Sequence, residues 1–414
     1  MQMQAQAQPT LSLDQALRLA QARSHQLVAQ DAAASAAREM AAAAEQLPDP
    51  TLKAGVNNLP IDGPDRYSLT NDFMTMRSIG VMQEFTRADK RRARSVRFER
   101  EAEVAQAGRA VALADLRRDT AMAWLERCYQ ERMRAVLQAQ RTEAGLQVEA
   151  AEAAYRGGRG SQADVFAARS AVAQIDDRIR QADGQIAAAR TRLARWVGVQ
   201  ADEPLAPPPP LDTVALDAAH LDTELQRNPQ IALMAGQQAV ARAEADVARS
   251  DKHPDWSVEL MYNQRGPAYS NMVSLNVSIP LQLDPKNRQD RDVAARLARV
   301  EQLRAERDEA LRDRVAQARG WLQEWHSDRD RLAHYDRTLI PLAGERTRAA
   351  IAAYRGGGGP LGAVLEARRS EIDTRLDRLR LELEAAGLWA RLNTLIPTEP
   401  AATAPARPSA VTEH

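Results

Sequence analysis

The sequence lacks several features that most proteins of its size possess. Among its 414 residues there is one cysteine, Cys128, and aromatic residues make up 4%. A single cysteine cannot form an internal disulfide. Because aromatic side chains are this scarce, they would fill a thick core poorly. Basic and acidic side chains balance at 56 each, so the excess of basic charge that nucleic-acid phosphates attract is missing. These absences favour a thin, elongated body and argue against a nucleic-acid partner.

Other absences concern membranes and chemistry. There is no run of about 18 apolar residues that could form a membrane-spanning helix. The opening stretch MQMQAQAQPT has neither the basic nor the apolar region of a secretion signal, so we expect either a protein that stays inside the cell or a processed form. Nucleophile elbow, phosphate-binding loop, dinucleotide fingerprint and zinc motif are all missing. We therefore predict that the chain is not an enzyme, and we assign no catalytic residue, metal site or cofactor.

What the sequence does contain is an internal repeat. The segment AYRGGRGSQADVFAAR begins at Ala154, and AYRGGGGPLGAVLEAR begins at Ala353, an offset of 199 positions. The two halves are joined by DEPLAPPPPLD, where consecutive prolines favour an extended spacer. We predict a first repeat over residues 1–201, a linker over 202–212, a second repeat over 213–397 and a disordered tail over 398–414.

Each repeat shows the same order of predicted elements. In the first, a helix at 12–46 precedes a β-hairpin at 51–85, a long helix at 88–154 and a return helix at 161–197. The second has helices at 217–251, 286–353 and 360–396, with a β-hairpin at 255–283. At 1.5 Å per residue, a helix over 88–154 would be about 100 Å long. Pro341 is expected to kink the second long helix.

The predicted strands alternate between apolar and polar residues, most clearly in WSVELMYN from Trp256 and MVSLNVSIPLQL from Met272. Their apolar face either packs against the helices or faces lipid. Because helices of that length leave a small sheet far from most of their surface, we favour lipid. The candidate lipid-facing residues are Trp256, Val258, Leu260, Tyr262, Val273, Leu275, Val277 and Ile279. Four strands cannot close a barrel, so at least two copies must assemble to span a membrane, and three copies would supply twelve strands.

Together these residues resemble the TolC-type outer-membrane efflux protein family, over nearly the whole chain from Leu11 to Ile396. The resemblance rests on the two YRGG turns, each followed by V-x-x-A-R. FMTMRSIGVMQEF from Phe73, Pro48-Asp49-Pro50 and NLPIDG from Asn58 are similar to the heavy-metal RND efflux branch. The resemblance implies a mainly α chain with a small β part: a long coiled-coil α-barrel plus β-barrel strands completed by trimerisation. It also implies a passive homotrimeric duct in the outer membrane of a Gram-negative bacterium, with its helical tunnel in the periplasm. The implied partners are a periplasmic adaptor, an inner-membrane RND pump and outer-membrane lipid.

The resemblance places functional residues at the two hairpin tips. Asp164 and Glu366 fall where the family carries acidic pore or gate residues; alternatively, each only caps or solvates its return helix. In the second repeat Ala363 and Gly359 depart from the family's tip pattern, so a gate that uses an arginine there is not expected. The candidate adaptor contacts are Arg156, Gly157, Gly158, Arg159, Gly160, Arg355, Gly356, Gly357, Gly358 and Gly359.

Three other interpretations remain. A drug-efflux or type I secretion duct would share the same family features. A cytoplasmic coiled-coil scaffold would fit the balanced charge but leaves the alternating strands unexplained. A soft-metal site among the methionines near the hairpins, such as Met76 and Met261, is weaker than a packing role, because methionine also fills irregular apolar surface.

Overall fold

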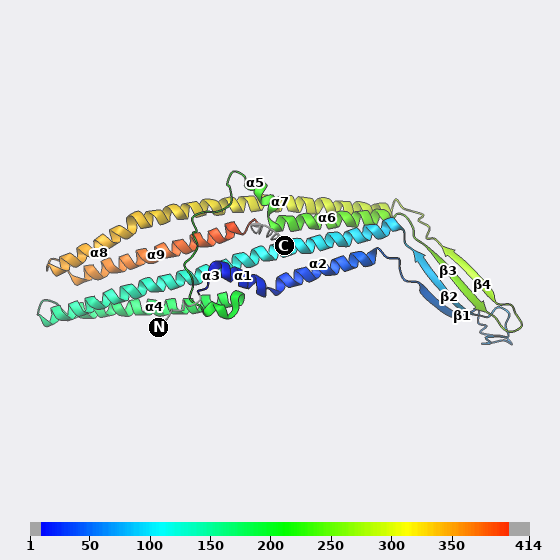
Figure 1. The fold of residues 1–414 in the computed structure, drawn as a ribbon, viewed down its shortest axis with the longest axis horizontal. Coiled ribbons are helices and arrows are strands. Elements are labelled where there is room, and N and C mark those ends of the chain that lie inside the picture. Colours follow the sequence, from blue (N-terminus) through cyan, green and yellow to red (C-terminus); the bar gives the residue numbers. More distant parts are fainter. Residues whose placement is uncertain (1–9, 397–414) are drawn as a thin grey trace, which may run out of the picture. The chain divides into compact units, whose positions relative to one another are not determined.

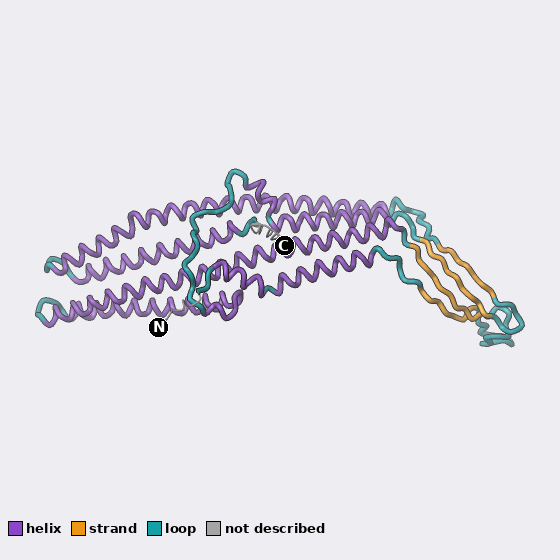
Figure 2. The backbone as a smooth tube through the Cα atoms, viewed as in Figure 1, coloured by secondary structure: helices purple, strands orange, loops and turns teal. Residues whose placement is uncertain are grey.

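The computed structural model describes residues 10–396, and the tail predicted over 398–414 lies outside this range. The predicted fold class is confirmed: most of the trace is helical, and the strands form one small sheet (Figures 1 and 2). The described chain divides into two compact units. The first contains residues 10–27, 110–229 and 311–396, and the second contains residues 28–109 and 230–310. Each unit therefore draws on both sequence repeats.

The second unit contains the sheet. Its strands are β1 (Thr51–Asn57), β2 (Met76–Phe85), β3 (Trp256–Gln264) and β4 (Met272–Ser278), paired antiparallel in the order β1-β2-β3-β4. Ala54 lies opposite Ile79, Ile79 opposite Tyr262, and Tyr262 opposite Val273. Because side chains alternate between faces, this register gathers most apolar residues of the four strands on one face, while Met82 and Met261 lie on the other. β1 and β4 are the edges and have no strand partner on their outer sides within the described chain.

Most of α2 (His25–Ala44) and nearly all of α6 (Pro229–Ser250) complete the second unit, with the starts of α3 (Ala88–Arg156) and α7 (Gln289–His334). A buried lysine joins the start of α3 to the start of β3. The Lys90 ammonium lies 2.8 Å from the Asp255 carboxylate and 3.1 Å from that of Asp251. The Arg87 backbone N–H donates to the same Asp255 carboxylate at 3.1 Å. This charge cluster fixes where the strand begins relative to the helix.

The first unit is built from α1 (Leu13–Arg23), the remainder of α3 and α7, α4 (Gln162–Val197), α5 (Leu221–Glu224), α8 (Ile340–Arg355) and α9 (Leu361–Asn393). Its main core is centred on α3, where Trp124, Leu125 and Tyr129 are fully buried. The Trp124 indole donates to the Leu11 carbonyl at 3.1 Å, and Leu11 forms a parallel bridge with Leu205. The segments before α1 and after α4 are thus fastened to the same stretch of α3.

The structure corrects three predicted element boundaries. The helix predicted over 12–46 is divided at Ser24, which is extended and whose hydroxyl accepts the Leu27 N–H. Most of the helix predicted over 217–251 begins only at Pro229, because proline favours the first helical position. Two short helical segments, residues 221–224 and 225–227, precede it. β4 ends at Ser278 although apolar alternation continues to Leu283, and Pro280 has no N–H for a ladder.

The long helix of the second repeat is not uniform. A π-helical turn, Tyr335–Leu339, separates α7 from α8, and Pro341 is the second residue of α8. In the first repeat α3 runs without interruption from Ala88 to Arg156. The helix interruption expected at Pro341 thus coincides with a π-helical turn, whose wider spacing accommodates a missing backbone donor. Within residues 10–396, no helix combines the length and apolarity that crossing a bilayer requires.

Candidate functional site: the hairpin tips and the sheet

The two hairpin tips in the first unit have the same backbone turn. In the first tip, Gly157, Gly158 and Arg159 donate their N–H groups to the carbonyls of Ala153, Tyr155 and Ala154. In the second, Gly356, Gly357 and Gly358 donate to the carbonyls of Ala352, Tyr354 and Ala353. The distances lie between 2.9 and 3.1 Å in both. The offset of 199 positions is therefore preserved in the hydrogen bonds.

Glycine is favoured at two points of each turn. Gly158 and Gly357 have φ of 71° and 75°, in the left-handed region that side chains with a Cβ disfavour. A Cβ at Gly160 would lie 3.1 Å from the Ala154 Cβ, and one at Gly359 would lie 3.2 Å from the Ala353 Cβ. All ten candidate tip residues thus lie in or beside these turns. Their contact with an adaptor stays a prediction.

Asp164 forms a capping box at the start of α4. It accepts the Ser161 N–H at 3.0 Å and the Ser161 hydroxyl at 2.7 Å, while its own N–H donates to that hydroxyl at 3.1 Å. The hydrogen bonds from Ser161 hold the pKa of Asp164 below its usual value. The side chain therefore has the capping role that the sequence allowed as an alternative. A role in a pore stays a prediction.

Glu366 has different surroundings. It lies in the second turn of α9, whose cap residue Pro360 makes no side-chain hydrogen bond. Its side chain is exposed and lines a cavity together with Arg368 and Arg369. Asp164 and Glu366, both predicted from sequence as acidic pore or gate residues, thus have different surroundings, and their role in a pore stays a prediction.

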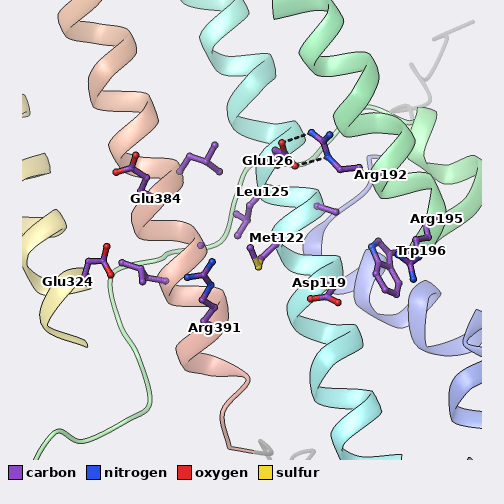
Figure 3. A pocket seen from close by; sticks show the side chains of 14 residues that line it. Asp119, Met122, Leu125, Glu126, Arg192, Arg195, Trp196, Glu324, Glu384 and Arg391 are labelled. Carbon is purple, nitrogen blue, oxygen red and sulfur yellow. Dashed lines mark hydrogen bonds and ion pairs between the residues drawn. The ribbon is translucent and has the colours of Figure 1, made fainter. Parts of the chain in front are cut away.

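A second cavity of about 620 Å³ lies in the first unit, and sequence reasoning missed it (Figure 3). Its apolar side chains include Met122 and Leu125 of α3, and Trp196 of α4 lies nearby. Charged groups surround them, and Glu126 of α3 receives two hydrogen bonds from Arg192 of α4. No sequence signal could reveal this cavity, because four helices supply its wall.

The sheet has one apolar and one polar face. Most candidate lipid-facing residues are well exposed, for example Leu260 at 54% and Val273 at 69%. Val258 is half-buried, and Ile279 lies just beyond the end of β4. The opposite face carries Lys53 of β1, which forms an ion pair with Glu259 of β3 across the intervening β2. It also carries Asn263, whose side-chain amide donates to the Ser274 hydroxyl at 2.9 Å.

The comparisons with known proteins agree with this fold. Residues 220–397 match the family described as outer membrane efflux protein. In the comparison with curated proteins, none matched the chain. Among solved structures, the outer-membrane channel OprN is 17% identical with a TM-score of 0.75, covering 92% of this chain and 89% of OprN.

Two further structures are similar. VceC, an outer membrane protein of Vibrio cholerae, is 18% identical with a TM-score of 0.74, over 92% of this chain and 95% of VceC. CusC, described as forming a transmembrane channel, is 15% identical with a TM-score of 0.74, over 93% of this chain and 92% of CusC. At these identities the likeness establishes a shared fold of TolC type.

Proposed function

We propose that this chain is the outer-membrane channel of a tripartite efflux system, a passive duct completed by three copies. The observation that carries the proposal is the sheet, which combines an exposed apolar face with two unpaired edges. The family match over residues 220–397 and the fold shared with OprN, VceC and CusC support it. The apolar face would contact outer-membrane lipid, and the polar face with Lys53 and Glu259 would line the passage.

The edges provide the reason for assembly. In hydrocarbon, each unpaired backbone N–H or C=O costs several kcal/mol. β1 and β4 each have seven residues, so neither edge is stable in lipid without a partner strand. Pairing β4 of one copy with β1 of the next satisfies both edges, and three copies would form a closed sheet of twelve strands.

Disulfide cross-linking between the edges tests this assembly. Within one chain, β1 and β4 are three strand spacings apart, or about 14 Å at about 4.8 Å each, whereas a disulfide needs Cα atoms closer than about 7 Å. After the buried Cys128 is replaced by serine, Val56→Cys on β1 is combined in turn with Val273→Cys, Leu275→Cys and Val277→Cys on β4.

We expect at least one of these pairs to give oxidised dimers and trimers on denaturing gels without reductant. The matched control combines Val56→Cys with Val258→Cys, which lies on the same face but on β3, a strand with both neighbours in its own chain. Monomers for all three edge pairs, or equal cross-linking of the control, would contradict the assembly.

The finer part of the proposal concerns cargo and partners. We infer heavy-metal cations as cargo, delivered by an RND pump and a periplasmic adaptor that contacts the two glycine tips. The support is the resemblance of the stretch from Phe73 to Phe85 to the heavy-metal branch. A strain that lacks the chain should lose tolerance to at least one of zinc, cobalt, cadmium, copper and silver. Unchanged tolerance to all five would reject this cargo and leave the duct standing.

A further inference from the structure

A cavity near the hairpin tips contains unmet hydrogen-bonding groups. It measures about 390 Å³ and is lined by α3, α4 and α9 of the first unit. It therefore touches both helical hairpins, because α3 and α4 form the first and α9 belongs to the second. A cavity of this size lies within the range of small-molecule sites.

The unmet groups are both acceptors and donors. Gln140 of α3 is only 5% exposed, lines the cavity, and its Oε1 has no hydrogen-bond partner among the described residues. In the same part of the chain, neither amide atom of Gln147 nor Nε of Arg368 has one. Buried polar groups are nearly always paired in folded proteins, because each unpaired group costs about 1–3 kcal/mol. Several such groups around one cavity are therefore available to a ligand with complementary atoms.

The charges decide what that ligand carries. Three arginines line the cavity: Arg178 pairs with Asp373 at 2.7 Å, Arg368 pairs with Glu143, and Arg369, which is exposed, makes no ion pair among the described residues. The only lining carboxylate is that of Glu366, and its side chain is exposed. The unmet donors, Arg368 Nε and Gln147 Nε2, suit an anionic oxygen.

The remaining wall defines the rest of the ligand. Leu365 and Ile372 of α9 and Ile175 of α4 supply an apolar surface. The unmet acceptors, Oε1 of Gln140 and Oε1 of Gln147, need an N–H or O–H donor. We propose that this cavity binds an organic anion with an apolar body and an N–H or O–H donor, and that the bound anion ties the two hairpins together. The proposal goes beyond the duct function and does not depend on its cargo.

Two matched dyes test the chemistry. 8-Anilinonaphthalene-1-sulfonate has an aromatic body, one N–H and a sulfonate, and N-phenyl-1-naphthylamine is the same molecule without the sulfonate. Binding to the full chain in phosphatidylcholine nanodiscs is measured by equilibrium dialysis, with empty discs as the blank. The sulfonate dye should bind saturably and about tenfold more tightly than the neutral dye, as one charge-assisted hydrogen bond predicts.

Three variants test the location. Gly362→Leu places a side chain in the cavity, where a Cβ meets no atom within 4 Å, and should weaken sulfonate binding at least tenfold. Gly184→Leu on α4 has equally open surroundings, does not line this cavity, and should leave binding unchanged. Gln140→Leu should weaken binding but raise the melting temperature of the ligand-free protein, because it removes a buried unmet acceptor. A variant that acted only through structural damage would lower that temperature.

Each outcome decides the proposal. The proposal is overturned if the sulfonate dye binds no more tightly than the neutral dye, or if its binding does not exceed that of the empty discs. It is also overturned if Gly362→Leu leaves binding of the sulfonate dye unchanged. A cross-linked trimer that binds no sulfonate dye would refute this site alone. Conversely, specific binding by a chain that never assembles would refute the duct and leave the site standing.

Discussion

Replacing Lys90 by methionine should strongly destabilise the unit that holds the sheet. The Lys90 side chain is 7% exposed and that of Asp255 is 16% exposed, so their ion pair is largely shielded from water. Lys90→Met keeps the side-chain length but leaves the Asp255 carboxylate buried without its cation. Breaking one side of a buried pair costs about 3–5 kcal/mol. For a unit of this size, each kcal/mol shifts the melting temperature by about 2–4 °C, so we expect a fall of about 10 °C.

Thermal unfolding followed by circular dichroism in detergent measures this effect. The double variant Lys90→Met with Asp255→Leu should recover most of the loss, because an apolar replacement of a whole buried pair is often neutral or stabilising. Asp251, the other carboxylate near Lys90, remains 44% exposed and stays hydrated. A single variant that melts within about 2 °C of the native chain would refute the account of this anchor.

Three further predictions concern the tips. Gly158→Ala should lower the free energy of unfolding by about 1–2 kcal/mol because φ is positive at this position. Gly145→Ala within α3 should raise it by up to about 1 kcal/mol. Chemical denaturation measures both changes. In single-channel recordings, Asp164→Asn, Asp164→Ala and Glu366→Ala should each alter conductance or cation preference. Only Asp164→Ala removes the side-chain acceptor of the Ser161 N–H, while the Ser161 hydroxyl still accepts the N–H of residue 164. Traces identical to the native channel would remove both residues from the pore. The folded pKa of Asp164 is lowered, so its capping contribution is complete above about pH 4 and is lost as the pH falls through the lowered value. The protection of the amides near Ser161 against exchange, relative to the intrinsic exchange rate at each pH, should therefore fall in acid. A protection that falls no more than in the Asp164→Asn variant would contradict this.

Much of the fold followed from local sequence signals. The two YRGG clusters predicted helical hairpin tips, and the structure has matching turns there because glycine adopts the positive φ at Gly158 and Gly357 without steric cost. The alternation from Trp256 predicted a two-faced sheet, since side-chain direction in a strand depends only on position. These features are encoded within a few neighbouring residues.

The features that escaped prediction depend on distant residues or on competing local effects. The break at Ser24 is one such competition, because a serine hydroxyl that caps the next helix outweighed a continuous helical pattern. The cavity that contains Gln140 and Arg368 joins residues more than two hundred positions apart, and no periodicity within one helix marks it. The sequence suggested Asp164 as a cap or a pore residue, and only the hydrogen bonds of Ser161 reveal the capping geometry.

Planar-bilayer recording of the purified, detergent-solubilised chain tests the central claim most directly. If three copies complete a duct, addition of the protein should produce discrete conductance steps of uniform size, and the oxidised Val56→Cys edge pairs should produce the same steps. Protein that enters the bilayer without conducting, or that remains a single water-soluble copy indifferent to detergent, would contradict the claim.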